Sequence, residues 1–540
     1  MKKNIIATLI ILLYTFLTYY ISLPALNLSA PSFWLFIIQI MIIILIVFNI
    51  VNTKLNTYTV GGVVKIDYDK SSYSKGLSVF NKIFGLGLLF IISGILLMNL
   101  VLSPIFNSKS YASRINVEDG EFKEDIKEVD FNKLPLLDKD STSKLGDRTM
   151  GEMPDLVSQF TVSNLYTQIN YNDEILRVTP LEYDGMVKYF TNKHEGVKGY
   201  ITVNSVNGDA NLVKLDKGMK YLPSAMFGED LKRKLVFDNP TKIFGEANFE
   251  IDEEGNPYWV VQTIKYSGVG LKKDISGVVL LNAITGESKY YDADEVPSWV
   301  DRVYSADLVI NQIDNWGTYV NGFINSIFGQ KNVVNTTEGY NYLKIDEDIY
   351  LYTGITSVLA DESNLGFMLV NLRTKESKYY SVSGAEEFSA MSSAEGLVQE
   401  KEYVASFPLL INLEGRPTYL LSLKDAAGLV KMYAFVDVSD YQIVSTTDSS
   451  LGIIKAKEEY LSKISNTSAN TNLDNKDITI KEILNATLNG NSIYYFIDNN
   501  DNKYQVNINV NDKLIPFIKV GDTINIEYIE NKVSVIKRIK

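Results

Sequence analysis

The sequence predicts a membrane-anchored α+β protein, and three observations carry this prediction. Long uncharged apolar runs are confined to the first 106 residues of the 540-residue chain. A pattern of strand, turn and strand then recurs, with helical segments between the copies. Near the carboxyl end the pattern changes to short segments in which apolar and polar residues alternate, as in β-strands. We expect a membrane domain (1–106) with three transmembrane helices, a large repeated domain and a small β-barrel.

The composition limits the class of protein before any motif is considered. A chain of 540 residues is too long for a single hydrophobic core, although 46% hydrophobic and 22% charged residues are ordinary proportions. The net charge of −13 opposes binding to nucleic acid, which needs clustered Lys and Arg. Because there is no cysteine, disulfides, thiolate nucleophiles and cysteine-bound metals are excluded. We expect no nucleic-acid partner and no cofactor.

Three apolar runs are long enough to cross a hydrocarbon layer of about 30 Å. They are Ile5–Ala25, Phe33–Val51 and Ile83–Phe106. Lysines precede the first run and lie between the second and third, whereas the link between the first two has no Lys or Arg. By the positive-inside rule, the amino terminus and loop 52–82 are cytoplasmic and everything after about residue 107 is outside. In the alternative, the first run is a cleaved signal peptide, which leaves that orientation unchanged.

The predicted exterior domain, residues 154–465, contains an internal repeat. Segment 279–291 (VLLNAITGESKYY) matches segment 368–380 (MLVNLRTKESKYY) in the Asn, the Thr and the whole Glu-Ser-Lys-Tyr-Tyr run. Looser copies occupy 201–213 and 432–444. Each copy reads as an apolar strand, a polar turn and a second strand, which is the signature of a hairpin.

Further elements complete the repeating unit. A second strand pair closes on a turn before these hairpins, at 251–259, 345–350 and 413–419. Helical stretches follow the hairpins, at 298–328, 385–399 and 451–464. The unit is therefore a helix plus an antiparallel sheet. We expect each sheet to bury one face against its helix and to expose the other face to solvent. We also expect the tandem units to form an elongated body.

The recurring hairpin ending in Asn-x-x-Thr-Gly-Glu, with its strand and helix, resembles the PepSY-type unit. This is a small cystatin-like fold of extracytoplasmic bacterial proteins and protease propeptides. In addition, segments 180–183, 295–304, 352–356, 389–396 and 428–435 resemble a family of poorly characterised multi-pass membrane proteins of Gram-positive bacteria. The resemblance covers about residues 80–450. It implies architecture and location only, and it supplies no catalytic residue.

The segments outside the repeats differ in composition and in hydrophobic pattern. Residues 107–153 are rich in Asp, Glu, Lys and Ser with little periodicity, and we expect a linker or stalk. A polar linker is also expected at 466–475. Beyond it, domain 476–540 contains short alternating strands and resembles a five-stranded barrel of the OB or SH3-like kind.

Two candidate sites are better explained by ordinary loops. His194 is the only histidine, so any Ser-His-Asp arrangement must use it, but no Gly-x-Ser-x-Gly elbow lies near a candidate serine. We interpret it as a surface or hydrogen-bonded loop residue. Segment Asp498–Asn502 partly matches a calcium loop, yet Lys503 replaces the required glycine and Asn509 the required glutamate. A hairpin turn is favoured there.

Acidic turns and aromatic residues are weaker candidates. Asp252–Glu254 and Asp361–Asn364 could serve a cation or an acid–base pair, although solvated turns are favoured. The aromatic residues of the repeats could form a glycan or peptide platform, although sealing the sheet against its helix is favoured. They are Tyr258, Trp259, Tyr290, Tyr291, Trp299, Trp316, Tyr379 and Tyr380. Segment Ser389–Gly396 could line a groove, with tight helix–sheet packing favoured.

These observations predict a non-enzymatic, membrane-tethered scaffold or interaction protein of the cell envelope. Its expected partners are the bilayer and an envelope protein or cell-wall polymer, and no catalytic, cofactor-binding or metal-binding residue is assigned. The alternative is a carboxylate-dependent hydrolase of a cell-wall polymer, which needs two carboxylates about 5–10 Å apart in a groove. A third hypothesis is a channel or transporter, against which the uncharged spans argue.

Overall fold

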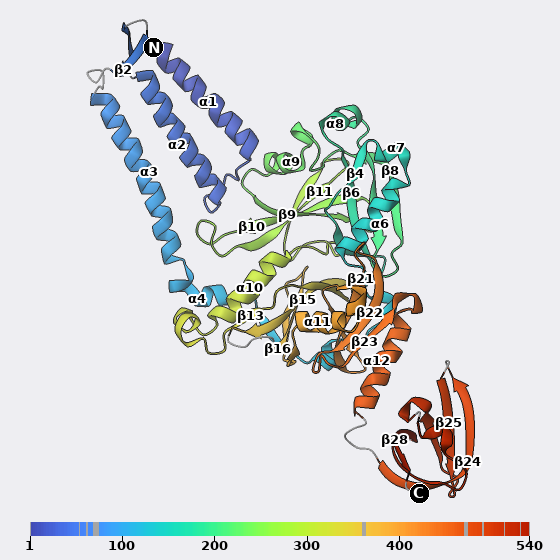
Figure 1. Ribbon diagram of the computed structural model, residues 1–540. Helices are drawn as coiled ribbons and strands as arrows, with labels where there is room; N and C mark the ends of the chain where they lie inside the picture. Colours follow the sequence, from blue (N-terminus) through green and yellow to red (C-terminus); the bar gives the residue numbers. More distant parts are fainter. Residues whose placement is uncertain are drawn as a thin grey trace.

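The computed structural model describes residues 2–52, 55–60, 63–68, 75–358, 363–468, 474–488, 491–511, 513–529 and 531–538. Figure 1 shows long helices at the amino end, a body of sheets and helices, and a smaller β domain at the carboxyl end.

Among the described residues, three helices are long and apolar enough to cross a membrane, as predicted. They are α1 (Lys2–Ser22), α2 (Pro31–Asn52) and α3 (Lys75–Val101). The third span covers Gly76–Val101, earlier than expected, because the helix ends before Pro104 and a separate helix, α4 (Pro104–Ala112), follows. Asn49 and Asn81 exchange two amide hydrogen bonds of 2.8 Å between α2 and α3. Such polar contacts join helices in lipid.

The strands β1 (Leu55–Val60) and β2 (Val63–Tyr68) form an antiparallel hairpin between α2 and α3. The body then consists of successive units, each a helix followed by an antiparallel sheet. Unit 1 contains α6 (Lys139–Gly151), α7 (Pro154–Val157), β4 (Phe160–Val162), β5 (Thr167–Tyr171), β6 (Glu174–Tyr183), α8 (Met186–Asn192), β7 (Val197–Asn204) and β8 (Ala210–Met219). Unit 2 contains α9 (Leu231–Asp238), β9 (Ile243–Ile251), β10 (Pro257–Lys265), β11 (Asp274–Asn282) and β12 (Ser288–Asp292).

Units 3 and 4 have the same plan. Unit 3 contains α10 (Ala306–Tyr319), the π-helical turn η4 (Asn325–Gly329), β13 (Val334–Thr336), β14 (Asn341–Ile345), β15 (Asp348–Ser357), β16 (Ser363–Asn371), β17 (Ser377–Tyr380) and β18 (Gly384–Ala385). Unit 4 contains α11 (Glu387–Gly396), β19 (Val404–Ala405), β20 (Leu409–Leu413), β21 (Arg416–Lys424), β22 (Val430–Asp437) and β23 (Val444–Asp448), and α12 (Ile453–Ser468) follows. The three predicted helical stretches therefore each contain a helix.

The predicted equivalence of the repeated hairpins is confirmed by their turns. At the end of the strand that enters the repeated hairpin of each unit (β7, β11, β16 and β22), one side-chain oxygen accepts hydrogen bonds from the backbone N–H groups two and three residues ahead. The residues that accept are Asn204, Asn282, Asn371 and Asp437. Gly286 has a φ of 74° and Lys375, at the same place in unit 3, a φ of 66°. The same turn chemistry therefore closes all copies.

The sheets of units 2 and 3 are buried on both faces, so the expectation that one face of each sheet is exposed to solvent was wrong. One face of the unit 2 sheet, with Trp259 and Val261, packs into a core shared with unit 1. The opposite face, with Val260 and Leu280, packs against α10 and unit 3. Helix α11 similarly belongs to the core between the sheets of units 3 and 4. Each sheet is covered by its own helix and also by a neighbouring unit.

Residues 113–138, here called the strap, differ from the linker that the sequence predicts for 107–153. Strand β3 (Val117–Gly120) pairs in parallel with β17 and extends the unit 3 sheet. Phe131 lies 6.1 Å from Phe435, ring centre to ring centre, in the core of unit 4. Phe122, Phe131, Leu134 and Leu136 belong to the core of units 3 and 4, whereas Ile115 belongs to the core between units 2 and 3. Their spacing follows neither a helical nor a strand period, so no periodic pattern marks them in the sequence.

The strap also brings unit 1 beside unit 4. The Ser422 hydroxyl donates to the Leu136 carbonyl at 3.0 Å, and Lys424 pairs with Asp138, the residue that caps α6. In Figure 1, units 1 and 2 lie on one side of the body and units 4 and 3 on the other. The expected elongated row of units is therefore folded back on itself.

The carboxyl-terminal domain consists of β24 (Asp474–Leu488), β25 (Asn491–Asp498), β26 (Lys503–Asn507), β27 (Thr523–Ile529) and β28 (Lys532–Arg538). The strands pair in the order β24-β25-β26-β28-β27, and β27 pairs again with β24. Between β25 and β26, Asp498 accepts hydrogen bonds from the N–H groups of Asn500 and Asn502, both at 2.9 Å. This is the predicted hairpin turn. Of the predicted linker 466–475, residues 469–473 lie outside the described residues.

Candidate functional site

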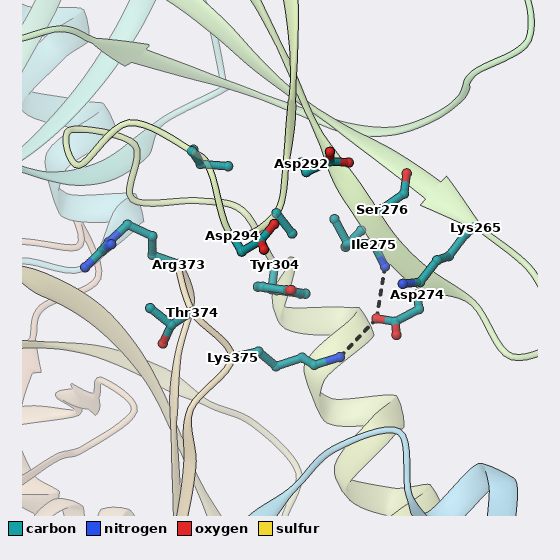
Figure 2. Close-up of a pocket in the computed structure, with 12 residues that line it drawn as sticks. Lys265, Asp274, Ile275, Ser276, Asp292, Asp294, Tyr304, Arg373, Thr374 and Lys375 are labelled. Atoms are coloured by element: carbon teal, nitrogen blue, oxygen red, sulfur yellow. Dashed lines mark hydrogen bonds and ion pairs between the residues drawn. The ribbon is translucent and has the colours of Figure 1, made fainter.

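A polar pocket of about 460 Å³ lies between units 2 and 3, and Figure 2 shows its lining. Lys375 from the unit 3 turn places its Nζ 3.1 Å from Asp274 Oδ1, which also accepts from Gln312 Nε2 at 3.1 Å. Arg373 binds Asp348 through two hydrogen bonds of 2.7 and 2.8 Å. The Lys375–Asp274 pair compensates charge across the boundary between the units, and Arg373 is neutralised within unit 3. The pocket is therefore explained as part of the contact that joins them.

A second depression, here called the Trp299 groove, has a different character. It consists of two cavities of about 310 and 210 Å³ that share Asp252 and Trp299 as lining residues. The larger cavity lies where units 1, 2 and 3 meet. Its lining is Asn170, Tyr171, Asn172, Asp173, Ile251, Asp252, Glu253, Ser298, Trp299, Asp301 and Glu347. The structure places no Lys or Arg among these lining residues.

Equivalent hairpins from three units converge on this groove. The turn between β5 and β6 contributes Asp173, the turn between β9 and β10 contributes Asp252 and Glu253, and the turn between β14 and β15 contributes Glu347. Lys344 Nζ lies 2.6 Å from Asp173, and Asn170 Nδ2 donates to Glu347 Oε2 at 3.0 Å. These contacts hold the turns of units 1 and 3 together. The acidic turns of successive repeats therefore become neighbours.

Aromatic side chains form the other wall of the groove. The smaller cavity is lined by Tyr258, Tyr291 and Trp299, and the rings of Tyr258 and Trp299 are 5.3 Å apart. Lys289 Nζ lies 4.5 Å from the centre of the Tyr291 ring. The three aromatic residues are half-buried.

The other predicted aromatic candidates serve packing. Trp259 and Tyr380 are buried in cores, Trp316 packs against Tyr379, and the Tyr290 hydroxyl donates to the Ser276 carbonyl. The favoured interpretation, sealing of the sheets, therefore holds for these residues. Tyr258, Tyr291 and Trp299 instead line a cavity, as the platform interpretation requires.

A buried charged cluster lies beneath the groove. Glu250 Oε2 accepts from the Asp301 N–H at 2.9 Å, and Asp301 Oδ2 accepts from the Asn170 N–H at 2.7 Å. Glu250, Asp301 and Arg302 are 0%, 3% and 8% exposed. Burial raises the pKa of Glu250 to about 7, against the influence of Arg302. Burial and the charge of Glu250 together raise the pKa of Asp301 well above its ordinary range.

The same cluster contains further polar groups that are costly to bury. The Arg302 guanidinium lies 3.8 Å from the centre of the Tyr342 ring. Burial, and then the charge of Arg302, lower the pKa of Arg177 to about 10. In the part of the chain that the structure describes, Arg177 Nε, both amide atoms of Gln168 and Glu250 Oε1 have no hydrogen-bond partner. Such a concentration of incompletely bonded polar atoms is uncommon in a protein core, and it distinguishes this junction from ordinary packing.

Sequence reasoning found some groove residues separately and missed the others. Asp252 and Trp299 were candidates, but nothing joined them. Asp301 and Arg302 lie within segment 295–304, whose resemblance to other proteins was the available signal. Trp299 was expected within a helix beginning at 298, whereas α10 begins at Ala306. Residues 298–304 take a nonhelical path, along which the Asp301 N–H bonds to Glu250 and Val300 and Val303 enter the core.

The remaining candidates lie elsewhere. His194 is exposed in the turn after α8. Ala390 and Ala394 of segment 389–396 are fully buried between units 3 and 4, which agrees with the favoured packing interpretation. Asp361 and Glu362 lie outside the described residues. Among the residues that are described, no three His, Asp or Glu side chains group closely enough to hold a metal ion.

No protein-family model matches the chain, and no curated protein matches it either.

Proposed function

We propose that the protein is a membrane-tethered scaffold or interaction protein of the cell envelope, and that its partner docks in the Trp299 groove. One observation carries the proposal: three equivalent hairpins bring four carboxylates beside an aromatic wall. The carboxylates belong to Asp173, Asp252, Glu253 and Glu347. A partner with positive charge and a flat or apolar face would complement this surface. An envelope protein with a basic segment, or a wall polymer with free amino groups, has that chemistry.

The alternative is a carboxylate-dependent hydrolase of a wall polymer, and the groove does place several carboxylates in one cavity. Their existing bonds favour binding instead. Asp252 accepts from the N–H groups of Glu254 and Asn256 at 3.2 and 2.7 Å, which fixes its turn. Hydrogen bonds from Lys133 and Lys344 lower the pKa of Asp173 to about 2. A general acid needs a raised pKa and an accessible proton, and Asp301, whose pKa is raised, is almost fully buried.

The finer architecture belongs to the same proposal. Helix-plus-meander units that recur with one turn chemistry support a PepSY-like assignment. Five strands whose pairing closes on itself support an OB or SH3-like assignment for the carboxyl-terminal domain. The lysines beside the apolar helices support a cytoplasmic amino terminus and an extracytoplasmic body.

The orientation predicts the behaviour of fusions in cells. A periplasmic-type or secreted reporter fused after Lys540 should be active, and the same reporter inserted near Ser72 should be inactive, because all the short-loop lysines lie on the cytoplasmic side. Enzymatic activity of both fusions, compared with their protein levels on a blot, checks this. A Lys540 fusion that is active only with a cytoplasmic reporter would refute the proposed location.

The docking site can be tested by photocrosslinking in intact cells. A photoreactive residue in place of Tyr291 should capture a partner, whereas one in place of the exposed Tyr441, on unit 4, should not. Adding Trp299→Ala should strongly reduce the yield, because the aromatic wall is lost. Adding His194→Ala should leave the yield unchanged, because that side chain lies in an exposed turn outside the groove.

The attached species and one further variant separate the hypotheses. The species crosslinked through position 291 is then identified. A protein would support the envelope-protein partner, and a polymer would support the cell-wall partner. Asp301→Asn should keep capture if the groove only binds. Accumulation of uncleaved polymer in cells that carry Asp301→Asn would favour the hydrolase. Equal capture by the photoreactive residue at position 441 would refute the groove as the docking site.

A further inference from the structure

The body is held directly against the outer ends of the membrane helices. The Leu26 N–H, in the link between α1 and α2, donates to the Pro240 carbonyl at 2.7 Å. At the end of α3, Asn99 Nδ2 donates to the Val269 carbonyl at 3.0 Å, and the Val269 N–H donates back to Asn99 Oδ1 at 3.2 Å. Both contacts involve unit 2. The face of the body around them must therefore lie close to the lipid that surrounds the helices.

A first apolar patch continues from the end of α1. It consists of Met186, Val187 and Phe190 on α8, and Phe227 between units 1 and 2. The Phe190 and Phe227 rings are 6.2 Å apart, and Val187 is 73% exposed. Arg233 connects the patch to the membrane helix, because its Nη1 donates to the Phe227 carbonyl at 2.8 Å and its guanidinium lies 4.4 Å from the Tyr20 ring.

A second apolar patch continues from the end of α3. It consists of Ile105 and Phe106 on α4, and Ile324, Ile327 and Phe328 at η4, all exposed, with Phe328 at 83%. Tyr111 of α4 and Tyr319 of α10 join its two parts, with rings 6.1 Å apart. Figure 1 shows α4 directly after α3, and α9 beside the outer end of α1. The two patches therefore adjoin different membrane helices.

We propose that both patches insert into the leaflet that faces the body, so that the body lies on the bilayer as well as being anchored in it. Large apolar side chains exposed in such groups are unfavourable in water and mark interaction surfaces. Lipid is the occupant that continuity indicates, since each patch begins at a helix that is already in lipid. Lys188 and Lys193 flank the first patch and complement anionic headgroups. The inference requires only that α1–α3 lie in a bilayer, so it stands apart from the groove.

Because the chain has no cysteine, a single introduced cysteine gives a unique spin label. Phe190→Cys and Phe328→Cys report on the two patches. Leu451→Cys is the matched control, an exposed apolar position next to α12, which Figure 1 draws at the far end of the body. The full chain is placed in nanodiscs at one copy per disc. Collisions of each label with lipid-soluble oxygen and with a water-soluble nickel chelate are then compared.

The labels at positions 190 and 328 should collide often with oxygen and rarely with the nickel chelate. The label at position 451 should collide often with the nickel chelate and less often with oxygen. Equal nickel collisions at all three positions would overturn the proposal. Protection at 190 and 328 only when discs hold two copies would overturn it as well, because the occupant would then be a second copy of this chain. Discs with and without anionic lipid test the lysines, and the first patch should insert more completely with anionic lipid.

A second pair of variants tests insertion of the same two patches without a label. Phe190→Asp and Phe328→Asp should leave the thermal unfolding midpoint in detergent unchanged, because both side chains are exposed. In membranes, the same variants should become more open to proteolysis at the body. Unchanged proteolysis with normal folding would count against insertion.

Discussion

Replacing Trp259 by alanine is expected to lower the free energy of unfolding by about 3–5 kcal/mol. Trp259 has no exposed surface, and it packs edge-on against Phe249 with ring centres 5.4 Å apart. Its Nε1 donates to the Tyr221 carbonyl at 2.8 Å, so truncation also leaves a buried acceptor without its donor. The core that it occupies is shared by units 1 and 2. The loss should therefore destabilise both units together.

Trp299→Ala is the matched control, because it removes the same side chain from a half-buried position in the groove. Its cost should be clearly smaller, since less apolar area returns to water. Urea unfolding of the full chain in detergent, followed by circular dichroism, measures both. Similar losses for the two variants would mean that Trp299 is a structural residue, which would weaken the proposed groove.

Replacing Arg302 by methionine is expected to lower the free energy of unfolding by up to about 3 kcal/mol near pH 8, because the positive charge of Arg302 favours the charged forms of nearby buried carboxyls. The affected carboxyls are Glu250 and Asp301, at 0% and 3% exposure. As the pH falls through about 7, Glu250 becomes protonated in the folded protein, so the loss should shrink. A loss that does not vary with pH would contradict the role of Arg302 as their counter-ion.

Glu250 itself predicts a pH dependence of stability. Its pKa is about 7 in the folded protein and about 4.5 in the unfolded chain, so the folded state binds the proton more tightly. The stabilisation is fully present below about 4.5 and is lost as the pH rises through about 7. Glu250→Gln should remove this part of the slope between those values. Unfolding titrations at several pH values compare the variant with the natural chain, and an unchanged slope would assign it to other groups.

The membrane helices and the repeated hairpins could be predicted because their signals are local. A span of lipid requires a continuous apolar run, and a hairpin turn requires particular residues at fixed offsets, as Asn282 and Asn371 show. Such requirements act within about 20 residues of chain. The position of α10 was less well predicted, because tertiary bonds hold residues 298–304 in a nonhelical path.

The sequence alone determined which segments form helices long and apolar enough to cross a membrane and which form the repeated hairpins, because these depend on neighbouring residues. Tertiary structure alone decided that the strap is packed, that sheets are covered on both faces and that acidic turns meet at Trp299. Asp173 and Lys344, for example, are 171 positions apart in the chain and 2.6 Å apart in space. The sequence of a single repeat does not specify which other repeats will pack against it. The groove forms only when whole units pack together and bring their acidic hairpin turns side by side.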